Sequence, residues 1–172
     1  MNVFLVGPMG SGKSAVGRQL ARRLRLPFID SDDEIEARTG VDISYIFSRE
    51  GEAGFRQRER EVIEDVTRES PIVLATGGGA ILLPENRAAL HERGFVAYLE
   101  TSLEQQAERV RQGRTRPLLH DVDPLTKLTE LMLVRAPLYE SLSDFTIATD
   151  GRKVHVVADA ILAAFKAAEE TP

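Results

Sequence analysis

The sequence has no cysteine among its 172 residues. Disulfide bonds, thiolate metal sites and cysteine nucleophiles are therefore excluded. The chain also lacks an apolar run of membrane-spanning length, and its N-terminus lacks the basic region, apolar stretch and cleavage site of a secretory signal. These absences predict a cytoplasmic protein without a membrane partner.

Excess positive charge is missing as well, because the formal net charge is −5 at pH 7. This sign argues against nucleic acid as a partner, so any basic site for an anionic ligand has to be local. Lysine is scarce, with 4 lysines beside 18 arginines, and a lone arginine therefore carries little information. The length fits one domain over residues 1–172, and the absence of an obvious apolar patch favours a monomer.

Short apolar runs alternate with helical patterns along the whole chain. The runs predict strands at residues 3–6, 26–29, 72–75, 95–99 and 145–148. Helical periodicity fills the intervals, and one of these helices is expected to end near Ala136. Five strands separated by helices predict an α/β fold, with a five-stranded parallel sheet covered by helices on both faces. Residues 33–68 are expected to form an inserted helical region, and residues 111–124 a loop.

The most informative motif is G-P-M-G-S-G-K-S at residues 7–14, which follows a predicted strand and opens a predicted helix. This context is typical of a phosphate-binding loop, whose backbone N–H groups and helix N-terminus surround a polyphosphate. A Cβ atom at Gly7 or Gly12 would obstruct the turn or the approach of the ligand. A glycine-rich turn that matches by chance is the alternative. We expect a nucleoside triphosphate site, with Lys13 at the phosphates and the Ser14 hydroxyl on Mg²⁺, made by Gly10, Ser11, Gly12, Lys13, Ser14 and Ala15.

Two carboxylates, Asp30 and Asp32, come at the end of the second predicted strand. One residue apart on a strand end, they would face roughly the same side. One can then orient the waters of a magnesium ion while the other accepts a proton from a substrate hydroxyl. The alternative is a turn in which Ser31 or Asp32 caps a helix that begins near Glu34. Beside a phosphate-binding loop, a phosphoryl-transfer site is the favoured interpretation.

Three consecutive glycines, Gly77, Gly78 and Gly79, follow the third predicted strand. Such a triplet is costly in backbone entropy, and it makes sense where the chain passes close to a ligand and offers its N–H groups. A flexible turn is the alternative. In the inserted region, Arg56 can present its planar fork to a carboxylate while Glu59 holds it from one turn away. By themselves, these two residues also fit an ordinary solvated helix face.

Two arginines lie in the second half of the chain in distinctive surroundings. Arg116 belongs to R-T-R-P-L-L in the irregular loop, where an arginine can supply charge to phosphoryl transfer and close over the site as a lid. An exposed loop charge is the alternative. Arg135 lies near an expected helix end, where interaction with the helix dipole is the ordinary explanation.

Taken in order, these segments resemble the shikimate kinase family. The segments are G-P-M-G-S-G-K-S, F-I-D-S-D, E-G-E-A-G-F-R, V-L-A-T-G-G-G, R-P-L-L and R-A-P-L-Y, and together they span the chain. The resemblance implies a three-layer P-loop kinase fold. It also implies transfer of the γ-phosphate of ATP to the 3-hydroxyl of shikimate, with Mg²⁺, in the chorismate pathway to aromatic amino acids.

The resemblance further implies the residues of the phosphoryl-transfer centre. Asp32 would orient or deprotonate the shikimate hydroxyl, and Lys13 and Arg116 would complete the catalytic set. Asp30 would hold the magnesium shell through water, and Ser14 would be the direct protein ligand.

The resemblance assigns the acceptor and the adenine as well. Arg56 and Arg135 would clamp the shikimate carboxylate, Glu59 would brace Arg56, and the glycine triplet would meet the substrate through the backbone of Gly78. ATP would be contacted by Arg116 at the phosphates and, at the adenine, by Arg109 and Arg152. Ala15 stands where many relatives carry Thr, which leaves the magnesium role of Ser14 intact.

Two other functions remain open from the residues. A related small-molecule kinase, such as a gluconate kinase or a nucleotide kinase, would share the phosphate loop but is not expected to combine the glycine triplet with R-P-L-L and R-A-P-L-Y. A nucleotide-dependent switch would lack an acceptor site, and Asp32, Arg56 and Arg135 speak against it.

Overall fold

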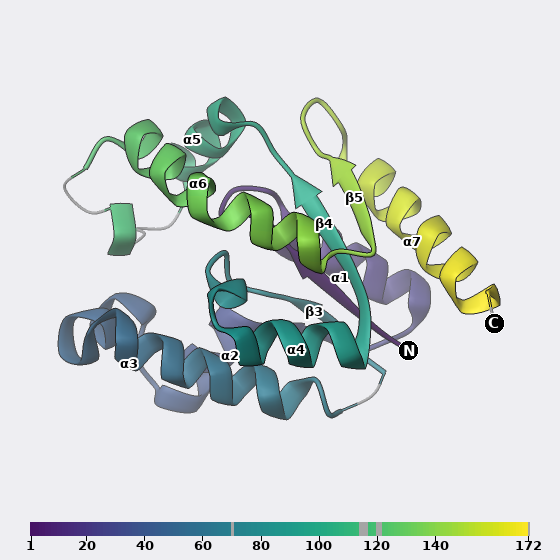
Figure 1. Ribbon diagram of the computed structural model, residues 1–172, viewed down its shortest axis with the longest axis horizontal. Coiled ribbons are helices and arrows are strands. Elements are labelled where there is room, and N and C mark those ends of the chain that lie inside the picture. The colour runs from purple at the N-terminus through teal and green to yellow at the C-terminus, as the bar shows by residue number, and fades with distance from the viewer. Residues whose placement is uncertain (70, 114–116, 120–121, 172) are drawn as a thin grey trace.

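The computed structural model describes residues 1–69, 71–113, 117–119 and 122–171. Its centre is one parallel sheet made of β1 (Asn2–Val6), β2 (Phe28–Asp30), β3 (Val73–Ala75), β4 (Gly94–Glu100) and β5 (Phe145–Ala148). The strands lie in the order β2-β3-β1-β4-β5, so β1 is central (Figure 1). Each predicted strand is confirmed within two residues of its expected bounds.

Helices fill the connections between the strands. Among the described residues these are α1 (Lys13–Leu24), α2 (Ser31–Thr39), α3 (Ile43–Val66), α4 (Pro84–Arg93), α5 (Leu103–Gln112), α6 (Pro124–Leu142) and α7 (Val154–Glu170). Two single turns of 3₁₀ helix, η1 (Ala80–Leu82) and η2 (Pro117–Leu119), lie in the connections after β3 and α5.

The sheet separates two apolar cores, because successive side chains of a strand point to opposite faces. On β1, Phe4 and Val6 pack into a core with α3, α4 and α6, while Val3 and Leu5 pack against α1 and α7 on the other face. Figure 1 shows the two sets of helices on the two sides of the sheet. The predicted three-layer α/β fold is therefore confirmed.

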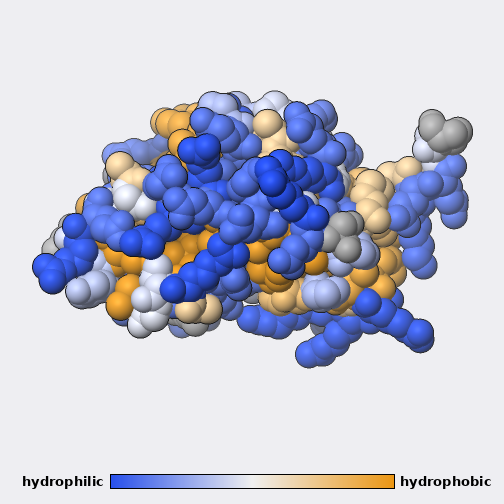
Figure 2. Space-filling view, turned by 90° about the horizontal axis from the view of Figure 1, so that it is seen from below, coloured by the Kyte–Doolittle hydropathy of each residue, from blue (hydrophilic) through white to orange (hydrophobic). Residues whose placement is uncertain are grey.

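The exposed residues of the helices are mostly polar, although Leu133 and Val134 of α6 are 76% and 61% exposed. Seen from below the view of Figure 1, the surface is largely hydrophilic, with hydrophobic side chains showing between the polar ones (Figure 2). In the part of the chain that the structure describes, every helix is too short or too polar to cross a bilayer.

Helix α6 continues past its expected end near Ala136 as far as Leu142, with Pro137 inside it. Proline removes one helical hydrogen bond, that to the carbonyl of Leu133. Pro137 is exposed and the Leu133 side chain is 76% exposed, so water reaches this side of the helix. The buried residues Tyr139 and Leu142 continue the packed face beyond the proline. The expected end was wrong because tertiary packing outweighs the local signal.

The polar segments gather at one edge of the sheet. In a parallel sheet, the carboxyl ends of all strands lie at the same edge, and ligands bind where the chain leaves them. Leu5 on β1 pairs with Ala75 on β3 and Ala97 on β4. The phosphate-binding loop after β1 and the glycine triplet after β3 are therefore neighbours, and α2 starts beside them after β2.

Candidate active site

The phosphate-binding loop adopts a conformation that requires its glycines. Gly7 and Gly12 have φ angles of 149° and 88°, in a region that other residues rarely adopt. A Cβ atom on Gly7 would lie 2.6 Å from the carbonyl oxygen of Leu99. Lys13 closes the loop, because its Nζ donates to the carbonyl oxygens of Gly7 at 2.7 Å and Pro8 at 2.8 Å. The loop is thus already curled at the N-terminus of α1.

The Asp30 carboxylate joins the phosphate-binding loop to α2. One oxygen, Oδ2, accepts from the Ser14 hydroxyl at 2.5 Å. The other, Oδ1, accepts from the backbone N–H of Asp32 at 3.0 Å and of Asp33 at 3.2 Å, which makes Asp30 the N-cap of α2. The alternative interpretation, in which Ser31 or Asp32 caps a helix starting near Glu34, is therefore wrong in its cap and in its helix start. Asp32 lies in the first turn of this helix rather than on the strand end.

Ser31 and Tyr139 anchor the glycine triplet, and sequence reasoning predicted neither of these contacts. Ser31 is fully buried, and its hydroxyl accepts from the N–H of Gly77 at 2.9 Å. The Tyr139 hydroxyl donates to the carbonyl of Gly78. The Gly77 N–H is therefore engaged by the protein. In the sequence, the signals that could have pointed to these contacts were the tyrosine of R-A-P-L-Y and the serine of F-I-D-S-D.

The glycine triplet leaves room for charged side chains. A Cβ atom on Gly77 would lie 2.8 Å from Asp32 Oδ1 and 2.9 Å from Glu59 Oε2, and one on Gly79 would overlap the guanidinium of Arg56. A Cβ atom on Gly78 would lie 3.5 Å from Nη1 of Arg135. The triplet thus lets four charged side chains from α2, α3 and α6 approach the end of β3.

Arg56 and Arg135 bring positive charge into a largely buried site. The Arg56 side chain is 11% exposed and donates from Nη1 to Glu59 Oε1 at 2.9 Å. Arg135 is 3% exposed and lies in the middle of α6, not at a helix end as the ordinary explanation required. Burial lowers the pKa of the Arg135 guanidinium, and the positive charge of Arg56 acts in the same direction.

Glu59 is the buried counter-charge of this pair. Burial, opposed by the positive charge of Arg56, raises the pKa of the Glu59 carboxyl to about 7. Its Oε2 atom has no hydrogen-bond partner among the described residues, and the same holds for Arg56 Nε. The site therefore contains two unsatisfied buried polar atoms, an arrangement that a bound polar ligand or water would complete.

Two adjacent cavities meet at Asp32. One, of about 400 Å³, is lined by the phosphate-binding loop and Arg109, and the other, of about 370 Å³, by the two arginines, Glu59 and the glycine triplet. Asp32, Gly77 and Gly78 line both cavities. Apolar residues form the far wall of the second cavity, among them Ile43, Phe47 and Phe55. Sequence reasoning missed this wall because these residues fit the ordinary apolar face of a helix.

The remaining predicted residues take different positions. Gly10, Gly12, Lys13, Ser14 and Ala15 line the first cavity, whereas Ser11 is buried beneath the loop, 2% exposed. Arg109 Nη1 donates to the carbonyl of Gly10 at 3.1 Å. Arg152 is exposed and lines neither cavity. Arg116 lies outside the described residues, but Pro117 and Leu118 of η2, in the predicted lid loop, line the second cavity.

The first cavity contains oxygen ligands suited to magnesium. Mg²⁺ prefers oxygen and is usually held by one or two protein groups together with waters and substrate phosphates. The Ser14 hydroxyl and the Asp30 carboxylate are in contact at the wall of this cavity. The described residues hold no group of three or more metal-binding side chains, so a metal here would rely on the nucleotide and water for its other ligands.

A curled phosphate-binding loop beside a second, arginine-lined cavity defines a P-loop kinase of a small anionic acceptor. The family model described as shikimate kinase matches residues 9–166. The chain belongs to the shikimate kinase family, and it is therefore an ATP-dependent kinase that transfers the γ-phosphate of ATP to the 3-hydroxyl of shikimate. It is 51% identical to shikimate kinase of Hahella chejuensis over 98% of this chain and 88% of that protein. It is 52% identical to that of Vibrio parahaemolyticus over 94% of each.

Solved structures agree with this assignment. Shikimate kinase from Acinetobacter baumannii in complex with shikimate matches with a TM-score of 0.95 and 44% identity, over 99% of this chain and 95% of that one. The Aquifex aeolicus shikimate kinase matches with a TM-score of 0.86 and 32% identity over the full length of both chains. A gluconokinase from Sinorhizobium meliloti, with a TM-score of 0.58 and 18% identity, shares the fold alone.

Proposed function

We propose that ATP occupies the cavity at the phosphate-binding loop, that shikimate occupies the cavity at Arg56 and Arg135, and that Asp32 serves the hydroxyl between them. The observation that carries this assignment is that Asp32 lines both cavities. A carboxylate in this position can accept the proton of the 3-hydroxyl while the hydroxyl oxygen forms its bond to the γ-phosphorus. The bond from the γ-phosphorus to the bridging oxygen breaks, and ADP leaves.

The two arginines fix the acceptor. Each guanidinium presents N–H groups in a plane that fits a carboxylate. With the carboxylate clamped at Arg56 and Arg135, the hydroxyl end of the ring is directed toward Asp32 and the phosphate loop. Such positioning can contribute about 7–11 kcal/mol toward the barrier. Glu59 braces Arg56 through their hydrogen bond of 2.9 Å, and the glycine triplet contacts the substrate.

The phosphoryl group is stabilised from the side of the first cavity. Lys13 exchanges its bonds to the loop carbonyls for phosphate oxygens when ATP is bound. Ser14 would hold Mg²⁺ directly and Asp30 would hold it through water, and the bound ion would supply positive charge against the phosphates. Arg109 and Arg152 contact the adenine, and Arg116 approaches the phosphates from the lid. The hydrogen bond from Arg109 to the carbonyl of Gly10 supports a role for Arg109 beside the nucleotide. The roles of Arg152 and Arg116 are inferred from the family resemblance.

We further propose a monomer that acts in the cytoplasm and binds no nucleic acid. The small size of the chain and the absence of an obvious apolar patch in its sequence support a monomer. The net charge of −5 disfavours a polyanionic partner.

The test is ADP release from Mg·ATP with and without shikimate, with gluconate and a nucleoside monophosphate in parallel. Strong stimulation by shikimate alone is expected. Stimulation by another acceptor, or by none, would leave the phosphate loop as a nucleotide site and contradict the assignment of the second cavity.

A further inference from the structure

Arg56 is held by two carboxylates of its own helix that differ sharply in burial. Nη1 donates to Glu59 Oε1 at 2.9 Å, and Nη2 donates to Glu52 Oε1 at 3.3 Å. The Glu59 side chain is 1% exposed and the Glu52 side chain 49% exposed. The buried partner thus makes the shorter bond, and the longer bond is made by a residue that water can replace.

One edge of the Arg56 guanidinium is only half used. The Nε–H and Nη2–H bonds of arginine point the same way, so this edge fits both oxygens of one carboxylate. Glu52 engages Nη2 alone, while Nε is buried and has no hydrogen-bond partner in the described part of the chain. A buried donor without a partner is unfavourable. A carboxylate seated across the edge would satisfy both donors, which Glu52 does not.

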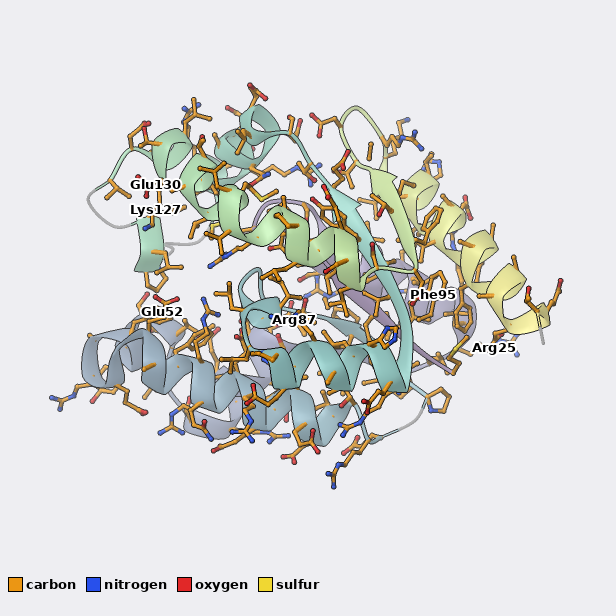
Figure 3. All side chains as sticks on the ribbon, in the orientation of Figure 1. Arg25, Glu52, Arg87, Phe95, Lys127 and Glu130 are labelled. Carbon is orange, nitrogen blue, oxygen red and sulfur yellow. The ribbon has the colours of Figure 1, made fainter. Side chains whose placement is uncertain are left out.

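Glu52 does not itself line the acceptor cavity, but it contacts Arg56, which does. Figure 3 shows it rising from α3 on the side where η2 lies, and α3 contacts η2. The cavity wall includes Arg56 from α3 and Pro117 and Leu118 from η2. The negative charge of Glu52 acts on Arg135 as well as on Arg56, so it lies within electrostatic reach of both arginines. An anion that enters this cavity is repelled by Glu52 and attracted by the arginines.

We infer that Glu52 is a displaceable counter-ion of the acceptor site, which holds Arg56 while the site is empty and yields the Nε/Nη2 edge to the substrate carboxylate. This inference rests on the proposed role of Arg56 as a carboxylate clamp. Glu59 stays in place because it is buried, whereas Glu52 turns to solvent. Glu52 thereby determines specificity, since an anion that bonds only one donor gains little by displacing it.

The test is the dissociation constant of shikimate, measured by calorimetry for the wild type, Glu52→Gln and Glu61→Gln. Glu61 is an exposed residue of the same helix that accepts from Gln57 at 3.2 Å, so Glu61→Gln makes the same change of charge away from Arg56. We expect Glu52→Gln to bind shikimate about three- to tenfold more tightly, as the loss of one partly exposed opposing charge allows. Glu61→Gln should bind shikimate with the dissociation constant of the wild type. Glu52→Asp keeps the negative charge, so its dissociation constant should lie closer to that of the wild type than the value for Glu52→Gln does.

A second ligand separates a charge effect from a change in cavity shape. Shikimate methyl ester lacks the carboxylate, so Glu52→Gln should not improve its binding. The inference is overturned if Glu52→Gln binds shikimate no more tightly than the wild type, or if the ester gains as much as the acid. Arg56→Lys tests the underlying assumption that Arg56 binds the carboxylate of shikimate. If that variant weakens shikimate binding and Glu52→Gln does not tighten it, the counter-ion role alone is wrong. If Arg56→Lys binds as the wild type does, the clamp itself is wrong and the inference falls with it.

Discussion

At the scale of single residues, the buried Glu59 carboxyl has a strongly raised pKa. Its side chain is almost fully buried, and Arg56, Asp32 and Arg135 are the charges that act on it. Burial favours the neutral carboxyl and Asp32 acts in the same direction, whereas the two arginines favour the charged form. Burial outweighs the arginines, because the pKa of Glu59 is raised to about 7. The protonation of the acceptor site therefore changes close to neutral pH.

This raised pKa predicts how stability depends on pH. Between about pH 4.5 and 7, Glu59 is protonated in the folded chain and ionised in the unfolded chain, so the free energy of unfolding falls as pH rises through this window. Urea unfolding of the ligand-free protein should show a loss on the order of 2 kcal/mol between pH 5.5 and 7.5 from this group. Glu59→Gln should lack that component, and Glu61→Gln should keep it. Equal slopes in Glu59→Gln and the wild type would show that Glu59 is ionised throughout.

Single residues also show what the sequence could predict. The phosphate-binding loop was predictable because its residues are contiguous and their spacing has one mechanical explanation. The contacts that Ser31 and Asp30 make were not predictable, since Ser31 meets Gly77 only through the pairing of β2 with β3. Asp30 serves two partners at once, the Ser14 hydroxyl and the N-terminus of α2. A local pattern does not reveal a side chain that joins two elements.

At the scale of elements, α3 is two helical pieces joined at Gly51. This residue has φ 71° and ψ −177°, a conformation that essentially only glycine adopts. Phe47 before the break packs against Phe55 after it, with ring centroids 4.8 Å apart and ring planes tilted by 35°. On the other side, Arg58 donates from Nε at 2.9 Å and Nη2 at 2.7 Å to Glu50 Oε1. The break therefore sets the place of the apolar wall of the acceptor cavity.

Gly51→Ala tests this role, with Gly40→Ala as the matched control. Both glycines are exposed, have positive φ and would place a Cβ atom in open space, but Gly40 lies in the left-handed region that other residues tolerate at moderate cost. We expect Gly51→Ala to lower the free energy of unfolding by about 1–3 kcal/mol and Gly40→Ala by about 1 kcal/mol. Gly51→Ala should also raise KM for shikimate without changing KM for ATP. Identical values for the two variants in urea unfolding and in both KM measurements would mean that the break has no special role.

Helix α6 shows why element ends are harder to predict than elements. Pro137 was a sound local reason to end the helix, but it lies on the exposed side while Arg135 and Tyr139 lie on the buried side. Which side faces the core depends on the packing of α6 against the sheet. Because the helix continues, Arg135 is a buried residue of the acceptor cavity, and the helix dipole does not explain its charge.

At the scale of the whole molecule, the sheet brings four distant segments to one edge. The loop after β1, α2 after β2, the glycine triplet after β3 and the middle of α6 contribute to two cavities that share Asp32. The class of fold was predictable because alternating strands and helices admit few arrangements. The meeting of the two cavities at one carboxylate follows only from the three-dimensional structure, and it is the central claim of the proposed mechanism.

Asp32→Asn tests that claim most directly, because it keeps the size of the side chain and removes the proton acceptor. We expect ATP binding to stay close to that of the wild type and shikimate-dependent turnover to fall about 10²- to 10⁴-fold. Asp65→Asn, which changes the same charge at an exposed position of α3 that lines neither cavity, should turn over within a few-fold of the wild type. The measurement is initial-rate ADP release at saturating shikimate, together with calorimetry of ATP binding. Near-normal turnover in Asp32→Asn would contradict the account, because the reaction would then proceed without a carboxylate at the junction of the two cavities.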